Sequence, residues 1–386
     1  MKRLTNICFV WLWGFLSLCL CVKAQEPTKL SFSQQLFGLA QYGYAYDHSF
    51  WMDGRYIPQV NFERPTGGKG LFDIEVSGNF YGSAGTLGDD WSSQGKIRPY
   101  RAWLRYSNER MELRAGLQKI NFGSAQLLRP LMWFDSLDPR DPLQFTEGVW
   151  GGLFRYYFKN NANLWFWALT GNNKRKGWEM TTNTKRFSPE FGGRFQMPVP
   201  SGESAVTLHY RESTLIPSSN QGIETGEFRV GLDTKVDVGV GLCLETTYQR
   251  MLKAVGPLNN QLAITGGIDY TFGVGNGLGA NLEHMFYTFG DSRFNKEYRY
   301  NSTALMMNYP IGLSDMLLLI GMYEWEKQDG HLFVGWKREM DHVSINLNAF
   351  WNPKQASSGQ LYGQNRMQGV GLQLIIIWNH YLEKLW

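Results

Sequence analysis

Alternating apolar and polar residues recur along nearly the whole chain, and this pattern constrains the fold more than any other feature of the sequence. In segment 71–81, phenylalanine, isoleucine and valine residues share one face, and acidic, hydroxyl and amide residues share the other. Segments 227–236, 239–250 and 342–351 repeat the pattern. Because successive side chains of a strand point to opposite faces, each segment predicts a β-strand with one apolar and one polar face.

The segment 98–106 follows the same rule and carries arginines on its polar face. Tyr100 and Ala102 are predicted on the apolar face, opposite Arg101 and Arg105. A strand of this kind would present a row of cations to whatever lies on its polar side.

About 18 such segments can be counted between residues 25 and 386, and 16 is an alternative because the first two and one near Glu190 are weak. The apolar faces often begin or end in an aromatic residue, as at Phe80, Tyr248 and Trp351, and 15% of all residues are aromatic. A soluble sandwich places its apolar faces in a shared core. A membrane barrel turns them toward lipid and concentrates aromatic residues at strand ends. The sequence therefore predicts an all-β fold, a transmembrane antiparallel β-barrel.

The first 24 residues have the composition of a secretory signal peptide. Lys2 and Arg3 form a basic start, residues 7–22 are mostly apolar, and Ala24 offers the small side chain that precedes a cleavage site. The remaining chain, residues 25–386, is predicted to form a single barrel domain.

Charge and cysteine content narrow the functional classes. The formal net charge is +4 at pH 7 and falls once the basic residues of the signal peptide are removed, which argues against a nucleic-acid partner. Three of the four cysteines lie in the signal peptide, so Cys243 has no disulfide partner. The histidines show no metal-ligand spacing and no Gly-x-Ser-x-Gly motif occurs. We therefore expect no enzyme, no metal site and no cofactor.

The alternation fails most clearly between residues 123 and 147, where three prolines interrupt any strand ladder. The leucine, methionine and aromatic residues of 127–134 would be costly in water, so the segment is predicted to fold into the lumen as a constriction loop. Two roles stay open, a plug and a charged pore lining. Asp135, Asp138 and Asp141 add a calcium site as a third possibility.

If the apolar faces meet lipid, the polar faces line a watery lumen in which arginines are frequent. These arginines can pair with lumenal carboxylates and serve only structure, or a surplus can guide an anionic solute or sugar acid past aromatic rings. Together with charged residues of the loop, they form the predicted set of pore-lining or solute-binding residues. The set is Arg101, Arg105, Arg114, Gln118, Arg129, Asp138, Arg140, Asp141, Arg155 and Arg194.

Three neighbouring motifs carry a family resemblance. Segment 114–123 reads Arg-x-Gly-x-Gln-x-Ile-x-Phe-Gly, the loop contains Asp-Pro-Arg-Asp-Pro at 138–142, and an aromatic strand follows at 155–158. This arrangement resembles outer-membrane barrels of the alginate-export and phosphate-selective-porin type, and the aromatic-rich style resembles outer-membrane proteins of Bacteroidota. The resemblance implies a barrel that moves an anionic solute or an acidic polysaccharide.

Three functional hypotheses follow. The first is a porin-like channel of the bacterial outer membrane for small hydrophilic solutes, anionic or saccharide. The second is an export or surface-anchoring barrel for an acidic polysaccharide, and the third is a secreted all-β carbohydrate-binding protein, suggested by the 15 tryptophans. For a barrel, the expected partners are outer-membrane lipid, the barrel-assembly machinery and the solute; the sequence leaves the oligomeric state open.

Overall fold

The structure is a computed structural model that describes residues 28–66, 69–179, 182–185, 187–215, 222–253, 255–291, 298–353 and 367–385. The predicted signal peptide, residues 1–24, lies outside the described residues.

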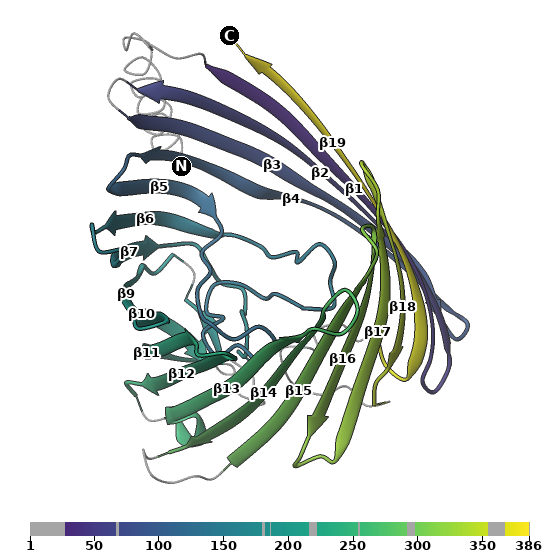
Figure 1. Ribbon diagram of the computed structural model, residues 1–386. Coiled ribbons are helices and arrows are strands. Elements are labelled where there is room, and N and C mark those ends of the chain that lie inside the picture. Colours follow the sequence, from purple (N-terminus) through teal and green to yellow (C-terminus); the bar gives the residue numbers. More distant parts are fainter. Residues whose placement is uncertain are drawn as a thin grey trace.

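Nineteen strands form one antiparallel sheet that closes on itself (Figure 1). Consecutive strands pair along the chain, and β1 completes the ring by pairing with β19, from Lys29 opposite Leu385 to Tyr44 opposite Val370. The short strand β8 pairs with the end of β10, while β7 pairs directly with β9. The barrel wall therefore has 18 strands and one extra short strand, which confirms the larger of the two predicted counts.

The strands are β1 (Lys29–Tyr44), β2 (His48–Thr66), β3 (Gly70–Leu87), β4 (Asp90–Ser107), β5 (Met111–Gln118), β6 (Val149–Tyr157), β7 (Asn163–Leu169), β8 (Thr182–Thr184), β9 (Glu190–Val199), β10 (Gly202–Leu215), β11 (Ile223–Asp237), β12 (Gly241–Met251), β13 (Asn260–Phe272), β14 (Leu278–Gly290), β15 (Tyr298–Ile311), β16 (Asp315–Glu324), β17 (Asp329–Glu339), β18 (Val343–Trp351) and β19 (Val370–Leu385). A short 3-10 turn, η1 (Gly256–Asn259), precedes β13. Within the described ranges, no helix is long and apolar enough to cross a membrane.

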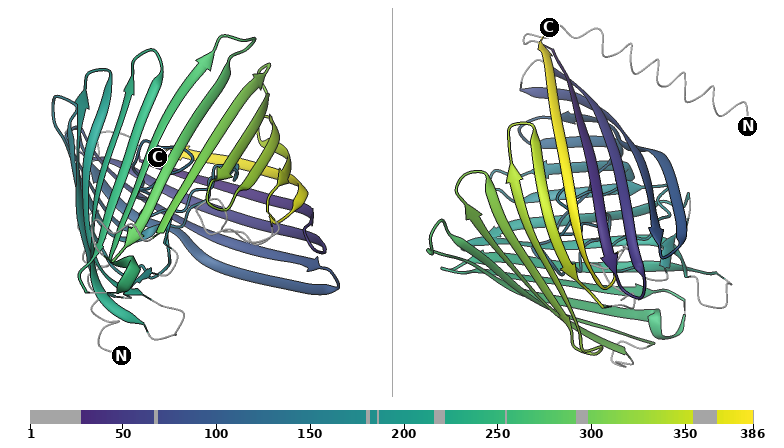
Figure 2. Two further views of the ribbon diagram at one scale, coloured as in Figure 1. Left: turned by 90° about the horizontal axis from the view of Figure 1, so that it is seen from below. Right: turned by 90° about the vertical axis from the view of Figure 1, so that its right-hand side faces the viewer.

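The two ends of the barrel, seen from two sides in Figure 2, differ in their connections. At the end that carries Lys29 and Leu385, neighbouring strands are joined by turns of two to five residues. At the opposite end, residues 119–148 join β5 to β6, and residues 170–189 join β7 to β9. We call these the turn end and the loop end.

Side-chain exposure follows the predicted alternation. On β18, Leu347 is 50% exposed on the outer face, whereas its neighbours Asn346 and Asn348 are each 5% exposed and face inward. The outward apolar band and the inward polar face are the arrangement of a barrel that spans a lipid bilayer. The transmembrane barrel predicted from the sequence is therefore the fold of the chain.

Tyr100 departs from this alternation. The pairing of β3 with β4 shifts register between Ser77 and Gly78, which inserts one extra residue into β4. A bulge of this kind places two consecutive residues on the same side of a strand. Tyr100 therefore joins Arg101 inside the barrel, and its predicted place on the outer face is wrong.

The wall is low on one side, and this positions the loops. Strands β5, β6 and β7 have 8, 9 and 7 residues, whereas β2, β3 and β4 have 19, 18 and 18. β4 pairs with β5 only from Ala102 to Ser107. Residues 119–148 consequently leave the wall well below the loop-end tip of β4 and turn into the lumen (Figure 1).

The fold predicts that an added arginine lowers the free energy of unfolding far more on the outer face of the barrel than on the inner face. Leu347→Arg, on the outer face near the middle of β18, should lower the free energy of unfolding by about 2–4 kcal/mol because the guanidinium meets lipid. Gln59→Arg, on the inner face of β2 beside an open cavity, should have a much smaller effect. Urea unfolding from phospholipid vesicles measures both, and equal losses would contradict the assigned faces.

Candidate functional site

Residues 119–148, here called the constriction loop, cross the lumen and end against the opposite wall (Figure 1). The carboxylate of Glu283, on β14 and 0% exposed, accepts three main-chain N–H hydrogen bonds from the loop. The donors are Gln126 at 2.7 Å, Leu127 at 3.0 Å and Leu128 at 2.7 Å. A loop that leaves regular structure inside a barrel must satisfy its main-chain groups there, and Glu283 does this for three consecutive residues.

Glu245, on β12 and also 0% exposed, is a second anchor. Its two carboxylate oxygens accept hydrogen bonds from the N–H groups of Ala125 at 3.0 Å and Leu131 at 2.5 Å. Gly123 lies at the approach with φ +108, and a side chain there would bring a Cβ to 2.5 Å from Glu245 Oε2. Only glycine combines this backbone conformation with such a close approach.

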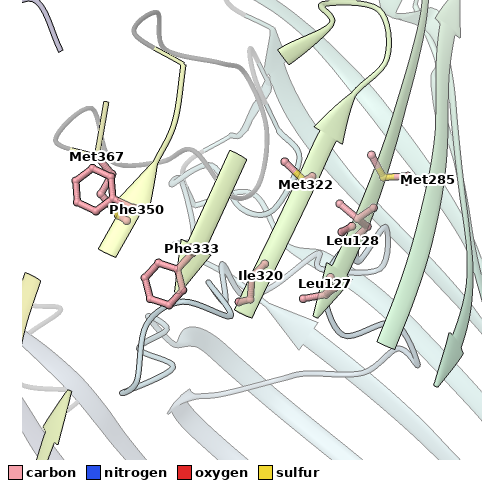
Figure 3. Packing of buried hydrophobic residues seen from close by; sticks show 9 residues of the cluster. Leu127, Leu128, Met285, Ile320, Met322, Phe333, Phe350 and Met367 are labelled. Atoms are coloured by element: carbon pink, nitrogen blue, oxygen red, sulfur yellow. The ribbon is translucent and has the colours of Figure 1, made fainter. Parts of the chain in front are cut away.

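The apolar residues of the loop explain why it folds inward. Leu127 and Leu128 are fully buried against an apolar patch on the inner face of β14 to β18 (Figure 3). This patch consists of Met285, Ala304, Ile320, Met322, Phe333 and Phe350, with Met367 beside it. An apolar wall inside an otherwise polar lumen is the seat that the sequence of 127–134 requires, and the predicted inward-folded loop is confirmed.

A second apolar contact holds the start of the loop. The ring of Phe122 stacks on that of Trp167 of β7, with centroids 5.9 Å apart, and meets the ring of Trp133 edge-on at 5.8 Å. The ring of Phe134 also meets Trp167 edge-on, at 5.5 Å. The indole N–H of Trp167 donates to His209 Nδ1 at 3.2 Å. Interlocked rings of this kind fix the loop as a rigid body rather than a mobile flap.

Residues 170–179, which follow β7, form a second inward loop that the sequence did not single out. Trp178 donates its indole N–H to the carbonyl oxygen of Arg129 at 3.0 Å, so the second loop rests on the first. Glu179 then forms salt bridges with Arg211 at 2.6 Å and Arg229 at 2.5 Å on β10 and β11. The two loops together fill the β9–β12 side of the lumen.

Two cavities lie along β1, β2 and β19. The cavity toward the loop end has a volume of about 440 Å³ and the one toward the turn end about 470 Å³. The first is lined by Phe37, Leu39, Asp53, Arg55, Tyr81, Gln94, Asp138, Arg140, Asp141, Pro142, Met367, Gln373 and Ile375. The second includes Ser33, Gln35, Ile57, Gln59 and Tyr100.

The returning limb of the constriction loop lies between the two cavities. Leu143 packs on Phe37, Ile375 and Ile377 of the wall. Asp141 shapes this limb, because its carboxylate accepts hydrogen bonds from the N–H groups of Leu143 and Phe145 at 2.9 and 3.0 Å. Burial raises the pKa of Asp141 above its ordinary value despite those two donors.

Three predicted arginines gather near the turn end on β4, β5 and β6. Arg114 lies 2.9 Å from Glu112, and Arg105 and Arg155 lie 3.8 and 3.9 Å from the same carboxylate. Indole rings flank them: the guanidinium of Arg114 lies 4.7 Å from the ring of Trp103, and that of Arg155 lies 3.8 Å from Trp165. Arg105 also donates hydrogen bonds from Nε and Nη2 to the carboxylate of Asp73.

This group, here called the arginine cluster, keeps part of its surface open to the lumen. The side chains of Arg105, Arg114 and Arg155 are 26%, 15% and 18% exposed. Three guanidinium groups share two carboxylates, those of Asp73 and Glu112, so positive charge predominates among these five side chains. Such a surface attracts anions.

The other predicted site residues divide into two groups. Asp138, Arg140 and Asp141 line the loop-end cavity, and Asp138 and Arg140 pair with each other at 2.9 Å. Arg101, Gln118, Arg129 and Arg194 are buried and hold structure instead. Arg101, Gln118 and Arg129 donate hydrogen bonds to the main-chain carbonyl oxygens of Thr146, Gly151 and Phe122, respectively. Arg194 donates to the carboxylate of Asp233.

The three aspartates considered for calcium each have another task. Asp135 lies 3.6 Å from Arg129, Asp138 pairs with Arg140, and Asp141 accepts main-chain N–H groups. Among the residues that the structure describes, no group of three acidic, histidine or cysteine side chains is arranged around a metal position.

Known proteins resemble this chain in structure but not in sequence. No family model matches the chain, and no curated protein matches it in sequence. Similar solved structures include OccK5 (OpdH) of Pseudomonas aeruginosa, with TM-score 0.55, 13% identity and coverage of 92% of this chain and 98% of that one. OccAB1 of Acinetobacter baumannii gives 0.54, 11%, 94% and 98%, and the outer membrane protein OprD of Pseudomonas aeruginosa gives 0.52, 10%, 94% and 96%. The chain thus shares the barrel fold of these proteins, and this fold fits the predicted outer-membrane location.

The loop anchors make a prediction. Glu283→Gln removes the charge but keeps one acceptor oxygen, whereas Glu283→Ala strands three buried N–H groups at about 1–3 kcal/mol each. The loop should therefore be held less firmly in Glu283→Gln and least firmly in Glu283→Ala. Single-channel current in planar bilayers should become larger and noisier in the same order. Glu339→Gln, at the exposed end of β17, is the control. Currents indistinguishable from those of the unmodified channel in both Glu283 variants would show that these bonds do not hold the loop.

Removal of the constriction loop tests its effect on the pore as a whole. Replacing Ser124 to Gln144 by a short glycine–serine linker should raise single-channel conductance, because the apolar plug and both anchored segments are lost. The wall strands pair independently of these residues, so the variant should still migrate as a heat-modifiable barrel. An unchanged conductance would mean that the loop does not narrow the path.

Proposed function

We propose that the chain is a porin-like channel of the bacterial outer membrane that admits small hydrophilic anions, including sugar acids. The arginine cluster carries this proposal. Its guanidinium groups stay charged at any physiological pH, offer two parallel donors to a carboxylate or phosphate, and lie beside indole rings that can stack on a sugar.

The route follows β1, β2 and β19. Solute enters the cavity at the loop end, passes the returning limb of the constriction loop, and leaves through the cavity at the turn end, which is lined by Tyr100 of β4, the strand that also carries Arg105 of the cluster. In bacterial barrels the short turns face the periplasm and the longer loops face outside. With that orientation the cluster stands on the inner side of the constriction and draws anions through it.

The cavities favour a small solute over a polymer. Volumes of about 440 and 470 Å³ are the size of sites for single small molecules. Two loops packed inside the lumen leave little room for a continuous polysaccharide strand, so export of an acidic polysaccharide is the weaker candidate. A secreted soluble protein is incompatible with the apolar outer face of a closed barrel.

Several partners belong to this proposal. Outer-membrane lipid would cover the apolar band, and the barrel-assembly machinery would insert the chain. The similar structures reported above come from Pseudomonas and Acinetobacter and give no support for an alginate or phosphate type of barrel or for Bacteroidota, so the proposal is limited to anions as a chemical class.

The test replaces the cluster. Arg105, Arg114 and Arg155 are changed together to Gln, and reversal potential is measured across planar bilayers in a KCl gradient at low salt, where the Debye length is about 30 Å. We expect anion preference in the unmodified channel and its loss in the triple variant. Arg338→Gln, an exposed rim residue paired with Asp315, is the control. Absence of anion preference in the unmodified channel, or its persistence in the triple variant, would overturn the proposal.

A further inference from the structure

Four side chains form a stacked column where the two cavities meet. The guanidinium carbon of Arg55 on β2 lies 3.8 Å from the centre of the Phe145 ring. Phe145 stacks on Tyr100 with centroids 5.0 Å apart and planes 12° from parallel. The guanidinium of Arg101 closes the column 4.0 Å from the Tyr100 ring.

The column stands at the boundary between the cavities. Arg55 lines the cavity toward the loop end, and Tyr100 lines the one toward the turn end. Phe145, which belongs to the constriction loop, lies between them. Its ring therefore separates a residue that lines one cavity from a residue that lines the other.

Arg55 differs from most other arginines of the lumen in how it is held. Arg105, Arg114 and Arg194 each pair with a carboxylate. Within the described residues, no group accepts a hydrogen bond from Arg55, and its Nε is buried without a partner; the carboxylates of Asp53 and Asp141 attract its charge from across the same cavity. Aromatic rings surround it instead, with Tyr81 at 5.5 Å and Phe37 at 5.7 Å in addition to Phe145.

We propose that Phe145 is the gate of this channel and that Arg55 is the residue through which an anionic solute opens it. The inference rests on the proposed function. At rest the guanidinium of Arg55 holds the Phe145 ring by a cation–π contact, which closes the passage. A carboxylate that enters the loop-end cavity offers Arg55 two charge-assisted hydrogen bonds, a stronger interaction than its contact with the ring.

Release of the ring then opens the way toward Tyr100. The anchors on Glu245 and Glu283 hold the loop upstream of residue 132 and the Arg101 bond holds Thr146, so the movement is confined to the Phe145 side chain and its short limb. Neutral solutes would lack the group that draws Arg55 away. The gate thus converts a charge preference into a permeation preference.

The experiment compares single-channel conductance in KCl with and without millimolar succinate. In the unmodified channel, succinate should raise the conductance or the fraction of time spent open. Phe145→Ala should at least double the conductance in KCl alone and make it insensitive to succinate. Arg55→Gln should also abolish the succinate response, because the solute no longer has a partner. Phe166→Ala, an aromatic residue 52% exposed on the outer face of β7, is the matched control.

The gate is rejected if Phe145→Ala conducts like the unmodified channel or if Arg55→Gln keeps its response to succinate. Heat-modifiable migration shows that each variant is folded. Reversal potential in the same membranes separates the two proposals. Anion preference with an unchanged Phe145→Ala conductance rejects the gate alone, whereas an enlarged Phe145→Ala conductance without anion preference rejects the anion channel and leaves Phe145 as a barrier.

Discussion

Five main-chain N–H groups held by two buried carboxylates are the constraint on which the interior of this barrel depends. A loop that crosses a lumen without forming a strand or helix leaves its backbone donors unpaired, and each unpaired buried donor is costly. Glu245 and Glu283 accept these donors from the far wall. Because both carboxylates sit on neighbouring parts of one rigid sheet, they fix where the loop lies, and thereby fix which part of the lumen stays open.

The unequal height of the barrel wall also determines which part of the lumen stays open. Short strands at β5 to β7 let both inward loops leave the wall low in the barrel, on the side away from β1 and β19. The apolar inner patch of β14 to β18 then receives Leu127 and Leu128. The two cavities described above lie on the side of β1, β2 and β19.

The fold was predictable from the sequence because the residues of a membrane-barrel strand alternate between apolar side chains that face lipid and polar side chains that face the lumen. The same reasoning failed at Tyr100, because a bulge changes the parity and leaves no mark in the composition of the segment. It also could not assign Glu245 and Glu283, which read only as two lumenal acids. Their partners are backbone groups more than a hundred residues away, and backbone donors have no sequence signature.

Arginine roles show the same limit in chemical terms. Parity places an arginine inside the barrel, but only the number and position of nearby carboxylates decide whether its charge remains available. Arg194 meets Asp233 in a buried bidentate pair and is neutralised as a unit. Arg105, Arg114 and Arg155 share Asp73 and Glu112 and stay partly exposed, while Arg55 contacts aromatic rings and has no hydrogen-bonded carboxylate among the described residues. In the proposed anion channel, selectivity would therefore depend less on how many arginines line the pore than on how few carboxylates pair with them.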